Sequence, residues 1–573
     1  MRRAWLAPLA TLLAAALGCT PSSPTATAKA GRAIAERLAQ GNPYPVNASP
    51  DARRLLVKSM NPSDFELQMI DAASGRVVAR TRSPDTQLAP SWRSDGRELA
   101  WLSDRDGDQR YRVHFFDVSS GRERAADSPV TTVTAMRWAP AGTRVAYLVG
   151  ERGVGTRRLV ALDGGDGRWR ELLAGISSRA GFTWSPRGDA LATVLAAAPD
   201  SIAIVDANGG APRLLPVTSD AEVRAVSWSP DGKRLLATAR RAGEEAFGLW
   251  LVDLADATSR LVGAAPGDIS GPLWSGDGFV YHVEHEGDVD VIACDRAARC
   301  RRLRAPPGRS AVTGISADGS RALVLHSGRT TAPALLALPL DGGAGTTLFQ
   351  ARQPEHAAVP ELVRISSHGV TLPSWLWRGT RVAGQAPAAI VRVHGGPDAE
   401  AVPTFDPALQ LAVERGFDVL SVNYRGSTGW GAAFEHSGGD RARVDDLRAA
   451  CAFVTTTLGV PRDRVVLFGH SYGAALVDRF AVEDADGPEL IVSISLTRAA
   501  FPSLPAARHR RLLAFQGAHD IAVSPAAARR SLEALFGADA AARVIVLPSE
   551  GHTFHRLDDW GRIWAELFAA VRP

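Results

Sequence analysis

A short motif that recurs through the first half of the chain constrains its fold more than any other feature. The clearest copy is Trp-Ser-Pro-Asp-Gly at residues 228–232, and successive copies begin 41 to 46 residues apart. Each copy ends an apolar run, makes a turn in which Gly permits a positive φ, and leads into a β-rich run. A period of this length is typical of propeller blades with four short strands each. The seven copies begin at Ala48, Trp92, Trp138, Trp184, Trp228, Trp274 and Ile315.

The repeats predict a seven-bladed β-propeller from about Tyr44 to Phe349. Their tryptophans are expected to pack between blades rather than to bind a ligand. A propeller alone would indicate a binding or scaffolding protein. Because its sequence holds no convergent set of catalytic side chains, the function has to be sought in the remainder of the chain.

From about Pro354 the period stops, and apolar β-like runs alternate with helical stretches. Such alternation predicts a mainly parallel sheet whose active site lies at the carboxyl ends of the strands. The expected strands are 389–393, 419–422, 464–468, 490–494, 512–515 and 544–547, and the expected helices are 445–458, 525–536 and 558–571.

The expected strand 464–468 runs into Gly469-His470-Ser471-Tyr472-Gly473, which has the G-x-S-x-G pattern of a nucleophile elbow. This pattern arises often by chance, but here it follows a strand and precedes a helix, as the elbow requires. A serine hydroxyl is a weak nucleophile and needs an oriented base. Ser471 is therefore the predicted nucleophile of an α/β-hydrolase domain.

The acid and the base are expected after the later strands. Asp520 ends Gly517-Ala-His-Asp520, and His552 ends Glu550-Gly-His552, so the chain order is Ser, Asp, His, as this fold requires. His519 and His555 are competing bases by proximity. His552 is preferred because it lies in the loop directly after the last strand.

A candidate oxyanion hole follows the first expected strand, in His394-Gly-Gly-Pro397. Glycines let backbone amides approach a developing oxyanion, so the expected donors are the N–H groups of Gly396 and Tyr472. The alternative is a plain Gly-Pro turn, which the neighbouring elbow, Asp and His disfavour.

Together these motifs resemble the prolyl oligopeptidase family, and within it the acylaminoacyl-peptidase and related dipeptidyl-peptidase branch. The resemblance covers nearly the whole chain after its first residues. It implies cleavage of short peptides, with the propeller covering the active site and excluding folded proteins. One departure is a short connection at 497–510, where the family has a longer stretch with helices that line the S1 pocket. The motifs are residues 394–397, 423–431, 469–473, 517–520 and 550–552.

The first residues have the plan of a secretory signal. Arg2 and Arg3 precede an apolar run that is too short to span a bilayer. The run ends at Gly18-Cys19, which resembles a bacterial lipoprotein signal with Cys19 as the acylated residue. The alternative is simple cleavage after 26–28. Export to a bacterial periplasm or outer envelope is expected, with a lipid at Cys19 as the only membrane attachment.

Export also determines how the other cysteines are interpreted. In an oxidising compartment, Cys294 and Cys300 are expected to close a hairpin with a disulfide, and Cys451 to be a buried apolar residue. The 65 basic and 61 acidic residues give a net charge of +4 without a basic stripe, so the sequence does not support a nucleic-acid partner, and none is expected. The sequence suggests neither a metal nor an organic cofactor.

The predicted organisation is a signal and linker at 1–28, a propeller with an N-terminal helical extension at 29–353, and a hydrolase domain at 354–573. The helical extension, about Ala30 to Ala39, is expected to pack on the hydrolase domain. The preferred function is a serine peptidase for short peptides. The alternatives are a carboxylesterase that uses the same three residues, and an inactive envelope protein that binds a partner through its propeller.

Overall fold

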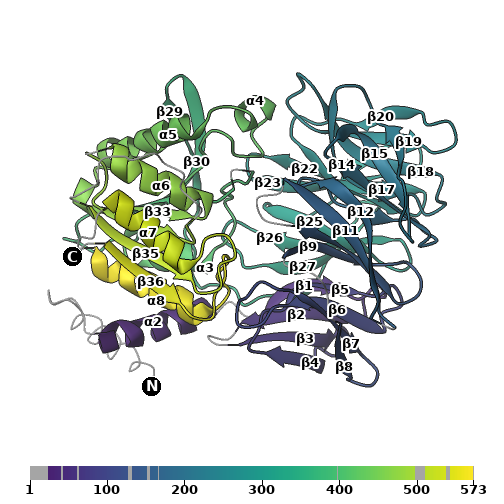
Figure 1. Ribbon diagram of the computed structural model, residues 1–573, viewed down its shortest axis with the longest axis horizontal. Helices are drawn as coiled ribbons and strands as arrows, with labels where there is room; N and C mark the ends of the chain where they lie inside the picture. Colours follow the sequence, from purple (N-terminus) through teal and green to yellow (C-terminus); the bar gives the residue numbers. More distant parts are fainter. Residues whose placement is uncertain are drawn as a thin grey trace.

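The computed structural model describes residues 24–39, 43–60, 64–126, 132–150, 155–165, 167–396, 398–484, 486–496, 510–536 and 542–571. Two lobes face each other in Figure 1. One holds the β-sheets of the first half of the chain, and the other holds a single sheet covered by helices. Cys19, Pro397 and most of the 497–510 connection lie outside the described residues.

The first lobe is a β-propeller made of short antiparallel strands. Strands β1–β4, β5–β8 and β17–β20 form four-stranded sheets, while β9–β16 and β21–β28 form eight-stranded ones. Within the larger sheets, β12 meets β14 only at Ile176 and Leu195, and β23 meets β25 only at Val289 and Arg309. The strands are therefore grouped in consecutive fours. They are β1 (Tyr44–Ala48), β2 (Arg54–Met60), β3 (Phe65–Asp71), β4 (Val77–Ser83), β5 (Leu88–Trp92), β6 (Glu98–Ser103), β7 (Arg112–Asp117), β8 (Glu123–Ala126), β9 (Thr132–Trp138), β10 (Arg144–Gly150), β11 (Thr156–Asp163), β12 (Trp169–Ser177), β13 (Thr183–Trp184), β14 (Ala190–Leu195), β15 (Ala198–Asp206), β16 (Arg213–Pro216), β17 (Ala221–Trp228), β18 (Arg234–Arg241), β19 (Gly248–Asp253), β20 (Ser259–Gly263), β21 (Ile269–Ser275), β22 (Gly278–His285), β23 (Asp288–Cys294), β24 (Cys300–Arg302), β25 (Arg309–Ile315), β26 (Arg321–Ser327), β27 (Ala334–Pro339) and β28 (Thr346–Gln350).

The repeated motif makes the turn between the first two strands of a group. At 228–232 the hydroxyl of Ser229 donates to Asp231 (2.6 Å), and the N–H of Arg234 donates back to Ser229 (2.9 Å). Gly232 closes the turn with φ +70°, where a side chain would be strained. The motif is thus a self-bonded turn.

The tryptophans of the motif connect neighbouring groups of strands. The indole N–H of Trp138 donates to the carbonyl of Ser91 (3.0 Å), that of Trp184 to Arg137 (3.2 Å), and that of Trp274 to Ser227 (3.1 Å). Each acceptor immediately precedes the tryptophan of the preceding copy, which is Trp92, Trp138 or Trp228. Trp138, Trp184 and Trp274 are also buried, so they pack between groups as expected.

The second lobe contains an eight-stranded sheet in the order β29-β30-β32-β31-β33-β34-β35-β36. The pairs from β31 onward are parallel, whereas β30 is antiparallel to both β29 and β32. The strands are β29 (Glu361–Ser367), β30 (Val370–Trp377), β31 (Ala388–Val393), β32 (Phe417–Val422), β33 (Val465–His470), β34 (Leu490–Ile494), β35 (Arg511–Gly517) and β36 (Ala542–Leu547).

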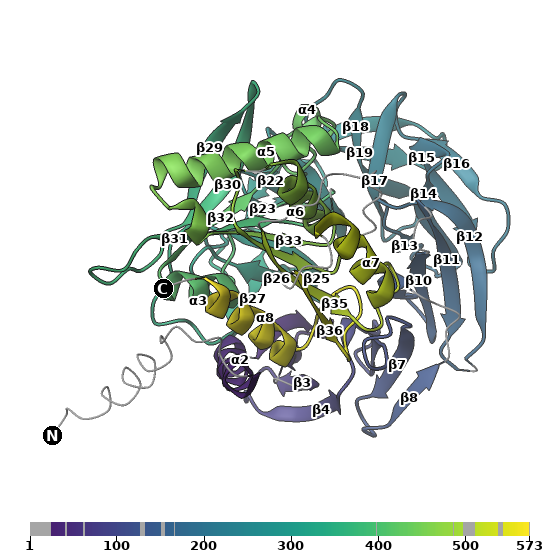
Figure 2. The same ribbon diagram turned by 60° about the vertical axis from the view of Figure 1, so that its left-hand side comes forward.

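Helices cover both faces of this sheet (Figure 2). One apolar core joins the sheet to α5, α6 and α7, and a second joins its other face to α2, α3 and α8. The N-terminal helix α2 therefore packs on this second lobe, which spans the predicted hydrolase domain, as expected. The helices are α2 (Pro24–Leu38), α3 (Pro407–Glu414), α4 (Ala432–Glu435), α5 (Asp440–Ala452), α6 (Tyr472–Glu483), α7 (Pro525–Phe536) and α8 (Leu557–Ala570), with a π-helical turn at Phe453–Thr457 and a 3-10 turn at Arg462–Arg464.

Helices α2 and α8 meet at two glycines. A Cβ on Gly561 would lie 2.2 Å from the carbonyl oxygen of Gly31, so the backbones approach each other too closely for a side chain there. Arg32 also pairs with Asp558 at 3.3 Å. Among the described residues, no helix has both the length and the apolar character needed to cross a membrane.

Three of the four cysteines lie among the described residues. Cys294 and Cys300 form a disulfide between β23 and β24. Cys451 is a free, buried thiol on α5, and burial raises the pKa of that thiol to about 12. It is therefore a packing residue.

Candidate active site

The strand-to-helix turn at Ser471 has the geometry of a nucleophile elbow. Ser471 stands between β33 and α6 with φ 56° and ψ −119°, a strained conformation for a residue with a side chain. A Cβ on Gly469 would lie 2.4 Å from the carbonyl oxygen of Gly473, and one on Gly473 would lie 2.3 Å from that of Val393. Only glycine fits on either side of the turn, and Ser471 is held at the start of α6.

The structure brings Ser471, His552 and Asp520 together. The Ser471 hydroxyl lies 2.8 Å from Nε2 of His552, and Nδ1 of the same imidazole lies 2.8 Å from Oδ2 of Asp520. Ser471 lies in the turn after β33, His552 in the loop after β36 and Asp520 in the loop after β35. The three side chains form one continuous series of hydrogen bonds, as catalysis by a nucleophilic serine requires.

Asp520 is held as an anion by its surroundings. Burial alone raises the pKa of this carboxyl, but the hydrogen bond from His552 and the amides of Ala522 (2.7 Å) and Val523 (3.1 Å) lower it to a net value below the ordinary one. The side-chain amide of Gln516 donates a further bond at 2.6 Å. An ionised, immobile Asp520 fixes the tautomer of His552 so that Nε2 faces the serine.

The competing histidines have other roles in the structure. His555 is close in sequence to His552, but burial lowers its pKa to about 4, and its backbone N–H donates to the Glu550 carboxyl group (3.0 Å). The backbone N–H of His519 donates to the carbonyl of Glu550 (3.0 Å). The imidazole paired with Ser471 belongs to His552.

Glu550 organises the loop that carries His552, a role that the sequence did not predict. Its carboxyl group accepts from the backbone N–H groups of His555 and Arg556, the latter at 2.7 Å. Burial raises the pKa of Glu550 to about 8. The only signal in the sequence was its place in the Glu-Gly-His motif. We refer to residues 548–556 as the His loop.

The expected oxyanion donors flank the nucleophile. Tyr472 is the first residue of α6, so its N–H has no acceptor within the helix and is available to a bound oxyanion. Gly396 has φ +131°, which strains residues with side chains, and a Cβ on Gly395 would lie 3.2 Å from Cβ of Ser471. The loop after β31 therefore passes directly beside the nucleophile.

Two further side chains hold the oxyanion loop and Tyr472. His394 lies against Tyr424 with ring centroids 4.3 Å apart, and its Nε2 is 2.9 Å from the Ser427 hydroxyl. Burial lowers the pKa of His394 to about 4, so the imidazole is neutral near pH 7. Arg443 donates to the Tyr472 hydroxyl at 2.6 Å.

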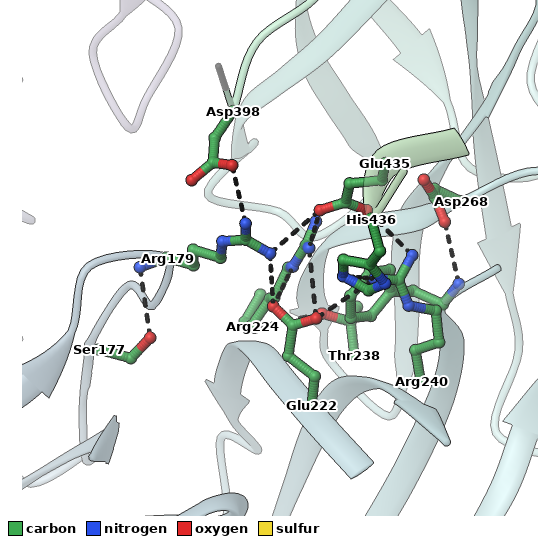
Figure 3. A network of polar contacts seen from close by, with 12 residues as sticks. Ser177, Arg179, Glu222, Arg224, Thr238, Arg240, Asp268, Asp398, Glu435 and His436 are labelled. Carbon is green, nitrogen blue, oxygen red and sulfur yellow. Dashed lines mark hydrogen bonds and ion pairs between the residues drawn. The ribbon is translucent and has the colours of Figure 1, made fainter. Parts of the chain in front are cut away.

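A network of charged residues joins the propeller to this side of the site (Figure 3). Arg179, Arg224 and Arg240 of the propeller contact the Glu435 carboxylate of α4 at 3.1, 2.6 and 3.0 Å. Arg179 also pairs at 2.7 Å with Asp398, which lies two residues after Gly396. Burial raises the pKa of Glu435, but Arg224 and Arg240 lower it to a net value below the ordinary one.

The geometry supports acyl transfer by the serine, histidine and aspartate. Within the described ranges, no group of three or more His, Cys, Asp or Glu side chains is arranged to hold a metal ion. The connection after β34 lies outside those ranges from residue 497 to 509.

Comparison with known proteins finds a family match within the second half of the chain. Residues 403–486, which include Ser471, match the prolyl oligopeptidase family. The chain is 28% identical over 385 residues to dipeptidyl aminopeptidase BIII of Pseudoxanthomonas mexicana, a match that covers 57% of this chain and 56% of that protein. It is 33% identical over 115 residues to dipeptidyl peptidase family member 6 of Caenorhabditis elegans, covering 20% and 14%. The chain thus spans about half the length of the first relative and less of the second.

Solved structures share the whole fold. A prolyl endopeptidase superposes with a TM-score of 0.77 at 15% identity, covering 98% of this chain and 93% of that one. A puromycin-hydrolyzing peptidase of Mycobacterium tuberculosis gives 0.75 at 20% identity, covering 94% and 95%. The acylaminoacyl peptidase of Pyrococcus horikoshii gives 0.66 at 14% identity, covering 92% and 95%. At these identities the likeness establishes a common architecture, a propeller followed by a hydrolase domain.

Proposed function

The chain carries a prolyl oligopeptidase family domain, and on that premise we propose that it is a serine peptidase that hydrolyses short peptides through an acyl-enzyme on Ser471. The observation that carries the proposal is the hydrogen-bonded series of Ser471, His552 and Asp520, with both separations at 2.8 Å. Peptide substrates are supported by the family match and by the peptidases among the relatives.

In the proposed reaction, Oγ of Ser471 attacks the carbonyl carbon of the scissile amide while Nε2 of His552 takes the hydroxyl proton. The amide N–H groups of Gly396 and Tyr472 stabilise the resulting oxyanion. When the C–N bond breaks, His552 gives its proton to the departing amine. Water then attacks the acyl ester and gives a proton to His552, and Ser471 leaves with that proton.

We propose that the seven consecutive groups of four strands are the seven blades of one propeller, which stands over the hydrolase site. Support comes from the pairing within fours and from the opposed lobes in Figure 1. Such a cover admits short or extended peptides and excludes folded proteins.

We also propose that the chain is exported and acylated at Cys19. The sequence pattern of residues 2–19 supports this, and only four residues separate Cys19 from the start of α2 at Pro24. In a bacterium that processes lipoproteins, the protein should incorporate labelled fatty acid, and Cys19→Ser should not. A Cys19→Ser protein that still incorporates label would contradict acylation at this residue.

The test of activity compares the mature protein with Ser471→Ala on an N-acetylated aminoacyl anilide, a dipeptidyl anilide with a free amine, and a short acyl ester. Amide cleavage that falls by about 10⁶-fold in the variant is expected. Ser437→Ala is the control, because Ser437 donates to the carbonyl of Phe434 outside the site. Ester turnover without amide cleavage would make the protein an esterase, and no turnover by the folded protein would overturn the proposal.

A further inference from the structure

A loop of the propeller lies directly against the His loop. This loop, residues 104–111, connects β6 to β7. A Cβ on Gly107 would lie 2.6 Å from the carbonyl oxygen of Ser549, and a Cβ on Gly551 would lie 2.5 Å from both Cγ of Gln109 and the carbonyl oxygen of Gly107. Both lobes therefore have glycine where their backbones meet, which lets the propeller reach the backbone of the catalytic base.

The contact ends in a hydrogen bond to His552 itself. The backbone N–H of His552 donates to Oε1 of Gln109 at 3.0 Å. His552, which supplies the base, is thus held through both its side chain and its backbone. Its imidazole is held by Asp520 of the hydrolase lobe, and its backbone is held by a side chain of the propeller.

Gln109 is itself held in place within the propeller. Its side chain hydrogen-bonds Tyr111, and its backbone N–H donates to Oδ2 of Asp104 at 3.2 Å. Asp104 in turn accepts from the hydroxyl of Thr86. Gln109 adopts φ 54°, a strained conformation for a side-chain-bearing residue that persists where the surroundings enforce it.

Burial makes the bond to His552 specific. Gln109 is 7% exposed and Tyr111 is 6% exposed, so water has little access to replace the glutamine oxygen. A buried amide N–H without an acceptor is costly, and the loop would shift to find another partner. A second contact, from the Arg556 side chain to the carbonyl of Pro84 at 2.8 Å, fixes the end of the His loop to the same region of the propeller.

We propose that Gln109 is a positioning residue for catalysis, through which the propeller places His552 at hydrogen-bonding distance from Ser471. This inference rests on the proposed function, because it assigns His552 the role of base. It makes the propeller part of the catalytic machinery as well as a cover for it. The alternative is a purely structural role, in which Gln109 only fills space between the lobes.

Two substitutions separate positioning from filling. Gln109→Met keeps the size of the side chain and removes the acceptor, whereas Gln109→Glu keeps an acceptor and adds a negative charge. The control is Gln87→Met, because Gln87 is a buried propeller glutamine that hydrogen-bonds Thr81 and Phe65 instead of the His loop. Thermal unfolding of all three variants shows whether each is folded at the assay temperature.

The first readout is the rate at which an aryl fluorophosphonate modifies Ser471, because this reaction needs the base but no peptide substrate. We expect Gln109→Met to slow labelling and kcat about ten-fold with little change in KM. Gln87→Met should retain the wild-type rates. Gln109→Glu should retain most of the plateau rate but move the acid limb of the pH–rate profile to higher pH, because the added carboxylate favours the protonated imidazole.

The outcomes divide cleanly. Wild-type labelling rates in a folded Gln109→Met protein would overturn the inference, as would equal losses in the Met and Glu variants. Labelling of the wild type that slows in Gln109→Met, without turnover of any peptide, would support positioning and reject the proposed peptidase function. If phosphonate failed to label the wild type at all, both proposals would fall.

Discussion

The propeller holds the two catalytic loops of the hydrolase domain in two different ways. At the His loop the contact is neutral and closely fitted, with Gln109 bonded to His552 and glycines on both sides. At the oxyanion loop the contact is ionic, because Arg179 joins Asp398 to the cluster around Glu435. Glu435 is buried at a side-chain exposure of 2%, whereas Asp398 is 51% exposed.

This difference determines how a substitution affects each contact. Glu435 has three arginine partners, so the loss of one arginine leaves the carboxylate paired, but the loss of Glu435 leaves buried Arg240 short of negative charge. The neutral contact has a single bond to His552 and depends on shape. We therefore expect changes in the ionic contact to affect stability first and changes in the neutral contact to affect rate first.

The largest effect is expected from Glu435→Gln. Removing one charge of a buried ion pair costs about 3 kcal/mol in the free energy of unfolding, measured by urea unfolding. Because the pKa of Glu435 is lowered in the folded protein, its contribution is fully present above the ordinary Glu pKa of about 4.3. The contribution is lost as the pH falls through the lowered pKa. A variant with wild-type stability at pH 7 would show that the cluster is not stabilising.

Gly551→Ala should have the next largest effect, on rate rather than on stability. Its methyl group would meet Gln109 and Gly107, so the His loop would have to move away from the propeller. A displacement of about 1 Å at the base lowers kcat about 100-fold. The matched control is Gly439→Ala, because a Cβ on Gly439 has nothing within 4 Å. Equal kcat in the two variants would mean that the interface does not place His552.

A smaller effect is expected from Arg179→Gln. This change loosens Asp398, and thereby the loop that carries Gly396, but the pair is half exposed and contributes at most about 1 kcal/mol. We expect kcat to fall about three-fold at low salt. The difference from wild type should shrink in 0.5 M NaCl, because exposed charges are screened. A loss independent of salt would point to packing instead.

The smallest effect is expected at a third contact between the lobes. Arg364 of β29 pairs with Glu286 at 2.6 Å, but both side chains are more than half exposed. Arg364→Ala should leave kcat, KM and the melting temperature unchanged within experimental error. A measurable loss would mean that exposed ion pairs also hold the lobes together, and the comparison of the neutral and ionic contacts would then have to include this third contact.

Local patterns allowed much of the fold to be predicted. The turn motif marked consecutive groups of strands, and the elbow needed only the glycines on either side of Ser471. The helix expected at 445–458 begins at Asp440. Its first turn is polar and carries no apolar period, so the sequence pattern did not mark this start. At Phe453 the helix gives way to a π-helical turn. Strands β29 and β30 were missed, and in β30 the apolar run is interrupted by Pro373.

Contacts between distant residues were beyond prediction. Gln109 and His552 are 443 positions apart, and Arg240 and Glu435 are 195 apart, so no local spacing connects them. Gln109 lies in a polar loop that reads as an ordinary turn, Asp106-Gly-Asp-Gln109. Sequence patterns located Ser471, Asp520 and His552, whereas the propeller residues that contact their loops follow only from the three-dimensional arrangement of the two lobes.

The order of strands in the propeller has a consequence for chain topology. Each described group uses four consecutive strands, so the circle from β1 to β28 closes through contacts between finished groups, such as the bond from Ala317 N–H to the Pro50 carbonyl at 3.0 Å. Opening the circle at this seam would break no strand pair within a group. A propeller excised from the chain and circularly permuted at another junction between groups would likewise keep all of its hairpins. The chain itself does not join the two groups that meet at this seam, whereas it connects every consecutive pair of groups elsewhere, and α2 precedes one edge of the seam while β29 follows the other.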